Sequence, residues 1–406
     1  MNGTIFEVIV VGAGPSGLMC SYYLKHLGLE HILFDQGHIG ESWRVQRWNN
    51  FRMITPFRAS LLPGALLKTR KPESYGSARE MVSLLQEYVS SFQLPVTEQA
   101  QVLSIEKMPN SPVFQVKVLH DGETVRTYDA WQVIVAVGAS NRPYIPPIAE
   151  SLPGSVDQLH ASRYMQEDLL KAGGVLVVGG GQSGLEIAQD LLEHGRTVWL
   201  SARSHSQLPR QYRGKEIFQW FADARLAGDA PLSVDQRSPV ITYAIDDVAA
   251  LDRSSLAARG VRMLGPIVNV TGSRLTFSGW EDADVEAARN QSQSLLRKIG
   301  QYIEHQKLTV PEADGSIDLG PSPVAADLDL LSEDINTVVW ATGYTSSLPD
   351  IPCQLTSEQL MNHNQGVTAL EGLYVVGATS SAGSDYVAGA KEDASFVTNR
   401  IYGVLR

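Results

Sequence analysis

The sequence has few cysteines, a deficit of basic residues and no long apolar run. Cys20 and Cys353 are the only cysteines among its 406 residues, and neither belongs to a CxxC pair, so the chain has no disulfide framework and no redox dithiol. Acidic residues number 44 against 33 basic ones, a net charge of −11, whereas proteins that bind nucleic acids usually show a basic surplus. No apolar run approaches the ~18 residues that a membrane helix needs. The segment before Lys25 has Glu7 and no basic residue, unlike a secretory signal.

These absences predict a cytoplasmic protein with no membrane span and no nucleic-acid partner. Hydrophobic residues make up 43% of the chain and charged residues 19%, which is typical of a folded protein with a large core. At roughly 150 residues per domain, the length predicts two or three domains.

The first motif lies near the N-terminus. An apolar run over residues 4–11 is followed by Gly12-Ala-Gly14-Pro-Ser-Gly17, an apolar helical face and a second short strand over residues 31–34. In such G-x-G-x-x-G loops the first glycine permits a tight turn, the second lets a pyrophosphate approach the backbone, and the third lets helix and strand pack closely. Asp35 lies 23 residues after Gly12, where a carboxylate binds a ribose hydroxyl. The segment therefore predicts a dinucleotide site for an adenosine with a free ribose.

A second copy of this pattern begins at residue 175. The apolar strand 175–178 precedes Gly179-Gly-Gly181-Gln-Ser-Gly184, and a helix and the strand 198–200 follow. Here Arg203 stands near the end of the second strand in place of an acid. An arginine suits a ribose 2′-phosphate, and Ser201 and Ser204 add hydroxyl donors, so the second loop predicts an NADP site. The alternative is that Arg203 is a solvated surface residue.

Three further strand ends carry small residues, at 137–139, 341–343 and 377–379. Singly each could be an ordinary turn, because small residues are common there. Together with two glycine loops they indicate a flavoprotein with separate FAD and NADP domains, because small residues let the backbone approach a cofactor closely.

The order of these segments predicts an α/β fold with two Rossmann-like dinucleotide-binding domains. The FAD-binding domain is discontinuous, residues 1–145 and 345–406, and the NADPH-binding domain is residues 150–344 with an elaborated insertion at about 204–310. A capping box at Ser77 starts a helix that reaches Phe92, and a long polar helix is expected near 282–306. Two late strands, 338–340 and 374–376, are expected to return to the sheet of the first domain.

Further segments resemble a known family. Gly40-Glu-Ser-Trp43-Arg44, residues 208–215 and Ala341-Thr-Gly-Tyr344, together with the glycine loops, are similar to the class B flavin monooxygenases, which include the flavin-containing monooxygenases, the YUCCA enzymes and the Baeyer–Villiger enzymes. The resemblance covers nearly the whole chain and is greatest to short bacterial members. It implies that NADPH reduces FAD, that O2 forms a C4a-(hydro)peroxyflavin, and that one oxygen atom enters a small organic substrate.

The family's identifying motif is altered in this chain. His160-x-x-x-Tyr164 is intact, but five residues rather than three separate Gly154 from His160, and the aromatic start is Leu152. Baeyer–Villiger enzymes usually have Trp at the end of the motif, so Tyr164 favours oxygenation at nitrogen or sulfur. The alternative is that His160 only packs the linker.

The substrate and the catalytic residues are not identified by the sequence. Ile54-Thr55 stands where some members place an Asn beside the flavin. The aromatic residues of this region either line a substrate cavity or belong to the core: Trp43, Trp48, Phe51 and Phe57.

The predicted cofactor-binding residues fall into two sets, and no metal site is expected. The FAD set is Gly12, Ala13, Gly14, Pro15, Ser16, Gly17, Asp35, Gln36, Ser42, Trp43, Val102, Gly138 and Gly377. The NADPH and inter-domain set is Gly179, Gly181, Gln182, Ser183, Gly184, Ser201, Arg203, Ser204, Ala341, Thr342 and Gly343. Alternative functions are an NADPH-dependent flavin reductase or electron-transfer enzyme, Baeyer–Villiger oxygenation of a ketone, and a non-catalytic redox sensor. A homodimer is left open.

Overall fold

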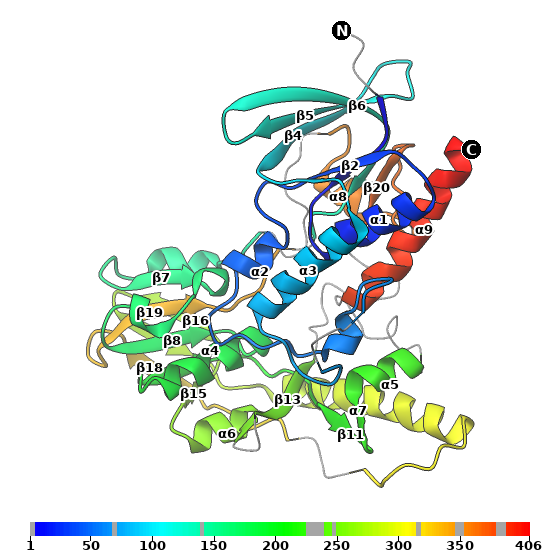
Figure 1. Cartoon of the computed structure of the whole chain (residues 1–406). Coiled ribbons are helices and arrows are strands. Elements are labelled where there is room, and N and C mark those ends of the chain that lie inside the picture. Colours follow the sequence, from blue (N-terminus) through cyan, green and yellow to red (C-terminus); the bar gives the residue numbers. More distant parts are fainter. Residues whose placement is uncertain are drawn as a thin grey trace.

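The computed structural model shows two α/β units, each built on a mainly parallel sheet (Figure 1). In Figure 1 the first sheet is at the top and the second at the lower left, and helices α5 and α7 lie at the lower right. The structure describes residues 5–66, 71–138, 142–224, 239–245, 249–313, 318–345, 353–378 and 387–406.

The first sheet has seven strands in the order β3-β2-β1-β6-β5-β4, with β20 also paired to β6. β1, β2, β3, β6 and β20 run parallel, whereas β4 and β5 form an antiparallel extension. The strands are β1 Ile5–Val11, β2 His31–Phe34, β3 Val96–Thr97, β4 Ala100–Lys107, β5 Phe114–His120, β6 Thr124–Val135 and β20 Leu373–Val375.

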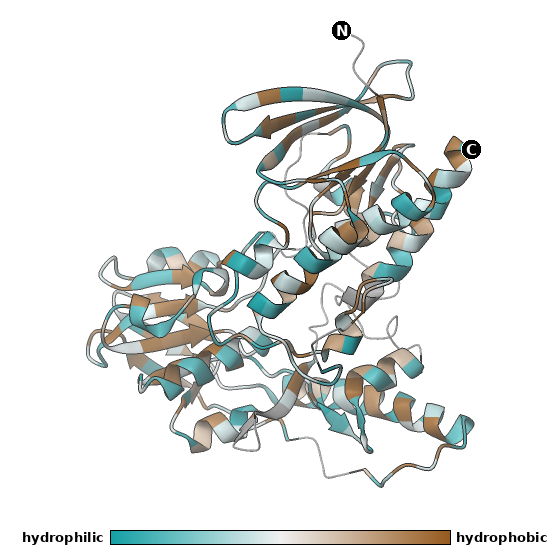
Figure 2. Cartoon of the chain, viewed as in Figure 1, coloured by the Kyte–Doolittle hydropathy of each residue, from teal (hydrophilic) through white to brown (hydrophobic). Residues whose placement is uncertain are grey.

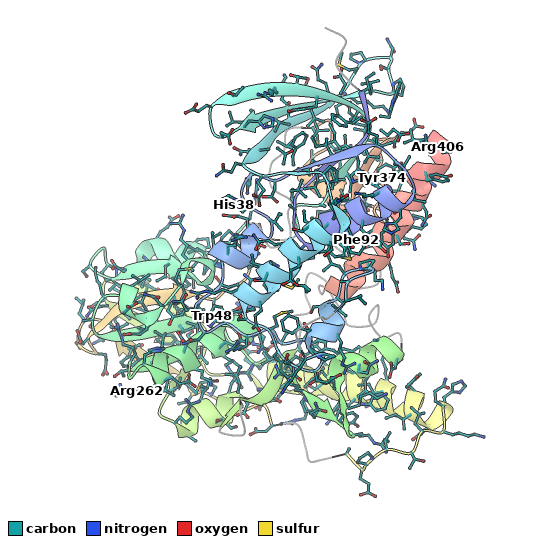
Figure 3. The ribbon with its side chains drawn as sticks, viewed as in Figure 1. His38, Trp48, Phe92, Arg262, Tyr374 and Arg406 are labelled. Carbon is teal, nitrogen blue, oxygen red and sulfur yellow. The ribbon has the colours of Figure 1, made fainter. Side chains whose placement is uncertain are left out.

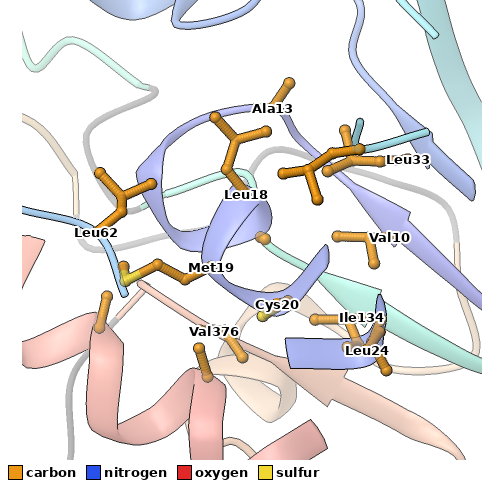
Figure 4. Packing of buried hydrophobic residues seen from close by; sticks show 14 of the residues in the cluster. Val10, Ala13, Leu18, Met19, Cys20, Leu24, Leu33, Leu62, Ile134 and Val376 are labelled. Atoms are coloured by element: carbon orange, nitrogen blue, oxygen red, sulfur yellow. The ribbon is translucent and has the colours of Figure 1, made fainter. Parts of the chain in front are cut away.

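Three helices cover one face of this sheet: α1 (Pro15–His26), α3 (Ala78–Phe92) and α9 (Val387–Leu405). Leu18, Met19 and Cys20 of α1 pack against Val10 and other strand residues in this core (Figure 4). The predicted capping box is confirmed: Ser77 accepts from the backbone of Glu80, whose side chain accepts from the Ser77 backbone.

The second sheet is entirely parallel, in the order β15-β9-β8-β19-β7. Its strands are β7 Asp157–His160, β8 Gly174–Val178, β9 Val198–Ser201, β15 Arg262–Leu264 and β19 Ile335–Trp340, and its strands at the centre are largely hydrophobic (Figure 2). Helix α4 (Gln182–Glu193) packs on one face. A small antiparallel sheet of β16 (Ile267–Thr271), β17 (Arg274–Phe277) and β18 (Ala326–Asp329) packs on the other.

One topological prediction is half wrong. The strand over 374–376 does pair with the first sheet, as β20. The strand over 338–340 belongs to β19, which lies between β8 and β7 in the second sheet. A short apolar run suits the centre of either parallel sheet, because both are buried on two faces.

The expected long helix is α7 (Asp282–His305), whose apolar side packs on α5 (Ile217–Asp223). None of the described helices is long and apolar enough to cross a membrane. The remaining elements are α2 Glu41–Val45, α6 Arg253–Ala258, α8 Ser357–Met361, β10 Gln207–Pro209, β11 Gln211–Tyr212, β12 Lys215–Glu216, β13 Val240–Ile245 and β14 Ala249–Leu251, with 3-10 turns at Phe57–Ser60, Pro147–Ser151, Ala161–Arg163 and Glu167–Leu169.

The aromatic segment between residues 43 and 57 connects the two units. Trp48, labelled in Figure 3, is buried with core residues of the second unit. Phe57 is buried with core residues of the first. The Asn49 backbone N–H donates to the Met165 carbonyl at 2.8 Å. Phe57 therefore belongs to the core, whereas Trp48 belongs to a core and also lines a cavity of about 420 Å³ together with Trp43.

Candidate functional site

The two glycine loops have nearly the same backbone. Gly12 has φ +108° and its N–H donates to the Phe34 carbonyl at 2.7 Å. Gly179 has φ +128° and its N–H donates to the Ser201 carbonyl at 2.8 Å. Both φ values lie where side chains are strained, so each loop needs glycine at this turn.

The second and third glycines of each loop differ in what surrounds them. A Cβ on Gly14 or Gly181 would meet no atom within 4 Å. A Cβ on Gly17 would lie 1.9 Å from the Gly12 carbonyl oxygen, and one on Gly184 would lie 1.8 Å from that of Gly179. The third glycine therefore lets the helix pack, whereas the second leaves open space for a ligand.

Most of the predicted FAD set surrounds one cavity of about 570 Å³. The cavity lies beside the N-terminus of α1 and at the carboxyl ends of β1 and β2, where a phosphate group is favoured. Its predicted lining residues are Gly12, Gly14, Pro15, Ser16, Asp35, Gln36, Ser42, Val102 and Gly138.

Several lining residues were missed from the sequence, including Val45, Gln46 and Gln101. Val45 lies three residues after Ser42, hence on the same face of α2, and Gln46 follows as the residue that ends the helix; this spacing was the available signal. Trp43 is not in this lining but in that of a separate cavity: its ring packs on Phe51, with the Arg47 guanidinium 5.3 Å from the ring centre.

Asp35 connects the first loop to the turn after β2. Its carboxylate accepts the N–H of Ala13 at 2.6 Å and that of Gly37 at 2.9 Å. Burial raises the pKa of Asp35, and these two hydrogen bonds oppose the rise. The carboxylate thus fixes the loop while lining the cavity.

The second unit has a different residue at this place. By strand register Phe34 corresponds to Ser201, so Ala202 takes the position of Asp35, and Arg203 that of Gln36. Arg203 and Ser204 line a separate cavity of about 770 Å³. Ser201 is buried and its hydroxyl donates to the Gly265 carbonyl at 2.8 Å, so it does not line that cavity.

The helix that follows the second loop is held to β13 through Gln182. The Gln182 side chain accepts the N–H of Ile241 at 3.0 Å and donates to Glu186 at 2.8 Å. Ser183, the next residue, is exposed at the loop.

The small-residue turns that follow β6 and β19 also have matching backbones in the two units. The N–H of Ala136 donates to the Val11 carbonyl, and that of Ala341 to the Val178 carbonyl, both at 2.8 Å. Gly138 and Gly343, two residues later, both have φ +79°.

The other members of these turns are placed as follows. The Thr342 hydroxyl donates to the Tyr144 carbonyl. Gly377 approaches α1 so closely that a Cβ would lie 2.1 Å from the Ser16 hydroxyl. Ala139 and Thr379 lie outside the described residues.

His160 and Tyr164 make inward contacts to two parts of the second unit. The Ser162 N–H donates to His160 Nδ1 at 3.1 Å, so Nε2 carries the proton and donates to the Gly343 carbonyl at 2.9 Å. Burial lowers the pKa of His160, which keeps the ring neutral.

Tyr164 donates to Asp190 of α4, whose other oxygen accepts from Asn50 at 2.7 Å. His160 thus positions the 341–343 turn, and the pair connects that turn, α4 and the first unit.

Comparison with known proteins agrees with this geometry. The family model described as pyridine nucleotide-disulphide oxidoreductase matches residues 9–224, more than half of the chain and both glycine loops. The chain belongs to this oxidoreductase family. A relative in the family, an uncharacterized CzcO-like oxidoreductase of Geobacillus kaustophilus, is 30% identical over 98% of this chain and 98% of its own length.

The predicted resemblance to flavin monooxygenases is confirmed within the family. The probable indole-3-pyruvate monooxygenase YUCCA1 of Arabidopsis thaliana is 30% identical over 84% of this chain and 76% of its own length. The structure of a flavin-containing monooxygenase from Stenotrophomonas maltophilia matches with a TM-score of 0.63 at 17% identity, covering 99% of each chain. At this identity the structure shows the shared fold, the two-unit α/β architecture.

Proposed function

We propose that this protein is an FAD- and NADPH-dependent monooxygenase that inserts one oxygen atom of O2 into a small organic substrate, at nitrogen or sulfur. In the balanced reaction, NADPH, a proton, O2 and the substrate give NADP⁺, water and the oxygenated product. The FAD-binding unit is assigned to residues 1–145 and 345–406, and the NADPH-binding unit to residues 150–344.

The observation that carries the proposal is a difference between the two units in the residue that follows the second strand of each. Their glycines agree in φ and in the open space at Gly14 and Gly181, so each loop fits a pyrophosphate. After the second strand, the first unit has Asp35 and the second has Ala202 followed by Arg203. A carboxylate accepts a hydrogen bond from a ribose hydroxyl but repels a phosphate, whereas arginine attracts one. Two dinucleotides of different ribose chemistry, FAD and NADPH, satisfy both sites.

The chain's own residues then have distinct tasks. The backbone N–H groups at the start of α1 and α4 face the two diphosphates, and His160 fixes the 341–343 turn through the Gly343 carbonyl. FAD bound in the first cavity supplies the oxygen-activating chemistry, and NADPH supplies the reducing hydride.

The absence of a usable dithiol favours oxygen as the electron acceptor over a disulfide. Both cysteines are free, and Cys20 is fully buried. Burial raises the pKa of the Cys20 thiol well above its usual range, which suppresses the reactive thiolate. YUCCA1, a relative within the family, is named as a monooxygenase, which supports the same choice.

The test is isotopic. The purified, flavin-loaded protein is supplied with NADPH and isotope-labelled O2 in the presence of separate amine, sulfide and ketone panels, and products are analysed by mass spectrometry. We expect label in an amine or sulfide product, and no product from the Gly181→Val variant, because its side chain would occupy the space for the NADPH diphosphate.

Two outcomes would replace the proposal. A labelled ester from a ketone would assign Baeyer–Villiger oxygenation instead. If no product carries label while NADPH oxidation passes electrons to ferredoxin-like acceptors, the protein is a reductase.

A further inference from the structure

The cavity of about 420 Å³ that Trp43 and Trp48 line is found where the two units meet. One wall is the segment 43–49, a second is the N-terminal part of α3, and Met165 of the second unit completes the lining. Helices α2 and α3 pack side by side there (Figure 1). The Asn49 N–H donates to the Met165 carbonyl at 2.8 Å, which fixes the second unit at this wall. Ligand sites measure roughly 300–1,000 Å³, so the cavity has room for a small molecule.

Helix α2 separates this cavity from the one proposed to hold FAD. Ser42 and Val45 line the FAD cavity, whereas Trp43, Arg44 and Arg47 line this one. The cavity of about 770 Å³ in the second unit shares no lining residue with it either. A ligand can therefore occupy this cavity while both dinucleotides are bound.

The charged side chains in its lining are all basic. Arg44, Arg47 and Arg79 line the cavity and no aspartate or glutamate does, although the chain has a net charge of −11. Within the described residues none of the three forms an ion pair. Glu98 acts on Arg44 electrostatically, but it lies outside the lining. A cavity with three cations and no acid favours an anion.

The three guanidinium groups use few of their hydrogen-bond donors within the protein. Arg44 Nε donates to the Ile39 carbonyl at 3.1 Å. Arg47 Nη1 donates to the Gln46 carbonyl at 2.9 Å. The exposed Arg79 side chain makes no hydrogen bond in the described part of the chain. Each guanidinium has five N–H donors in a planar fork that matches a carboxylate, so the remaining donors suit a planar acid.

Contacts between the walls bring these arginines to one cavity. Arg44 follows the start of α2 at Gly40, where a Cβ would lie 3.7 Å from Cγ2 of Val82 in α3. Val82 itself lines the cavity, one turn after Arg79 on the same face of α3. A ligand that fills the cavity therefore meets cations from both helices.

Two indole rings form the flat apolar part of the wall. The Phe51 ring packs edge-on against both, with its centre 6.0 Å from that of Trp43 and 5.2 Å from that of Trp48. The Arg47 guanidinium also lies 5.3 Å from the Trp43 ring centre. Trp48, labelled in Figure 3, is only 5% exposed. The rings are thus held in place before a ligand arrives, and they offer an aromatic body a surface next to the cations.

We propose that this cavity binds an aromatic carboxylate, with its acid group toward the arginines and its ring against the indoles. Because the walls belong to both units, the bound acid joins them at a place away from either dinucleotide cavity. The inference goes beyond the proposed monooxygenase function and does not depend on it, because the site includes no residue assigned to FAD or NADPH except Trp43.

The test compares 2-naphthoate with 2-naphthamide, which has the same rings and no charge. Both are titrated by calorimetry into the purified flavin-loaded protein with saturating NADP⁺ present. We expect one naphthoate to bind per chain, and the amide to bind at least about tenfold more weakly, because it forms no charge-assisted pair with arginine.

Arg79→Ala is the first variant, because its exposed side chain makes no other polar contact in the described part of the chain. It should lose roughly tenfold in affinity for naphthoate and hardly change for the amide. Arg47→Gln should show the same selectivity. Arg52→Ala is the matched control: it removes the same charge from the same region, but Arg52 pairs with Glu80 at 3.8 Å and lies outside the lining.

Three outcomes would overturn the inference. Equal binding of naphthoate and naphthamide, or no binding of naphthoate, would show that the arginines do not select an acid. If Arg79→Ala and Arg47→Gln both bind naphthoate as Arg52→Ala does, the acid binds elsewhere. If NADP⁺ displaces naphthoate, the ligand occupies the coenzyme site. The labelled-oxygen experiment is read separately, so the proposed function stands in each of these cases.

Discussion

The two nucleotide units share one loop design and differ in the residue that follows the second strand. Gly12 and Gly179 turn the chain in the same way, Gly14 and Gly181 face open space, and Gly17 and Gly184 contact the carbonyl of the first glycine. In the first unit Asp35 accepts two backbone N–H groups and braces its loop. In the second unit Ala202 packs at that place, and its methyl side chain can accept no hydrogen bond.

The difference shows that the shape of the loop and the charge beside it are set by separate residues. Glycine positions fix the backbone, because their φ values and close contacts exclude other side chains. The residue after the second strand changes the charge offered to the ribose without altering the turn. Of the four predictions below, the three on glycines and Arg203 test this separation and the one on Glu216 compares stability in the second unit; they start with the largest effect.

Gly14→Val should abolish FAD retention without unfolding the protein. The new side chain meets no protein atom at its Cβ but occupies space that the proposed diphosphate needs. Gly181→Val should instead keep the flavin and lose reduction by NADPH. Absorbance of the purified proteins measures the flavin, with circular dichroism as the control for folding; a fully yellow Gly14→Val protein would contradict the assignment.

Gly17→Ala should destabilise the protein by about 3 kcal/mol, because overpacking against a rigid backbone cannot be relieved by a rotamer change. The added Cβ would lie 1.9 Å from the Gly12 carbonyl oxygen. Gly184→Ala, with the corresponding contact of 1.8 Å to Gly179, should cost a similar amount. Urea unfolding measures both; a loss below about 1 kcal/mol in only one variant would show that the loops differ in rigidity, and such a small loss in both would contradict the prediction.

A third prediction concerns a buried carboxylate of the second unit. Glu216 is 5% exposed, and burial raises its pKa to about 7, with the Arg58 charge opposing the rise. Because the folded pKa exceeds the unfolded one, the protonated group stabilises the fold below about pH 4.5, and this stability is lost as the pH rises through 7. Glu216→Gln should therefore stabilise the protein at pH 8 by up to roughly 3 kcal/mol.

The measurement is urea unfolding of Glu216→Gln and the unaltered protein at pH 5 and pH 8. Their difference in stability should grow with pH. A difference that is constant across this range would show that Glu216 does not titrate there. Glu216→Gln keeps the shape and one hydrogen-bonding oxygen, so the comparison isolates the charge.

Arg203→Ala should weaken the use of NADPH by about 10- to 150-fold, corresponding to the 1.5–3 kcal/mol of a charged hydrogen bond. The use of NADH should hardly change, because it lacks the 2′-phosphate. Flavin reduction rates with each coenzyme measure the ratio. Equal losses with both coenzymes would indicate that the exposed Arg203 has a structural role.

Local motifs predicted much of this molecule. Both glycine loops, the helix that starts at Ser77 and the long helix near residue 282 follow from residue spacing, because their signals are contained within one or two turns. Strand partners were harder: residues 338–340 read as a buried strand, but sheet membership depends on pairings with distant segments. Lys298 of α7 lines the same cavity as Arg203, and the sequence could not place it there for the same reason. Trp43 lines a different cavity from the predicted one, because a motif indicates a segment and not the face that each side chain takes.

The pairing of β20 with β6 also determines the order in which the chain can fold as it is synthesised. Leu373 pairs with Val133, and the whole second sheet lies between these residues in the sequence. On the ribosome, the strands of the second sheet are therefore all available before β20 and α9 emerge. Until then β6 lacks its β20 partner beside Val133. The core around α1 also lacks three residues of α9: Ala394, Val397 and Ile401. The second unit can thus form as a folded module while the first waits for its final strand and helix, and the exposed apolar face of α1 is the surface that a nascent-chain chaperone would meet.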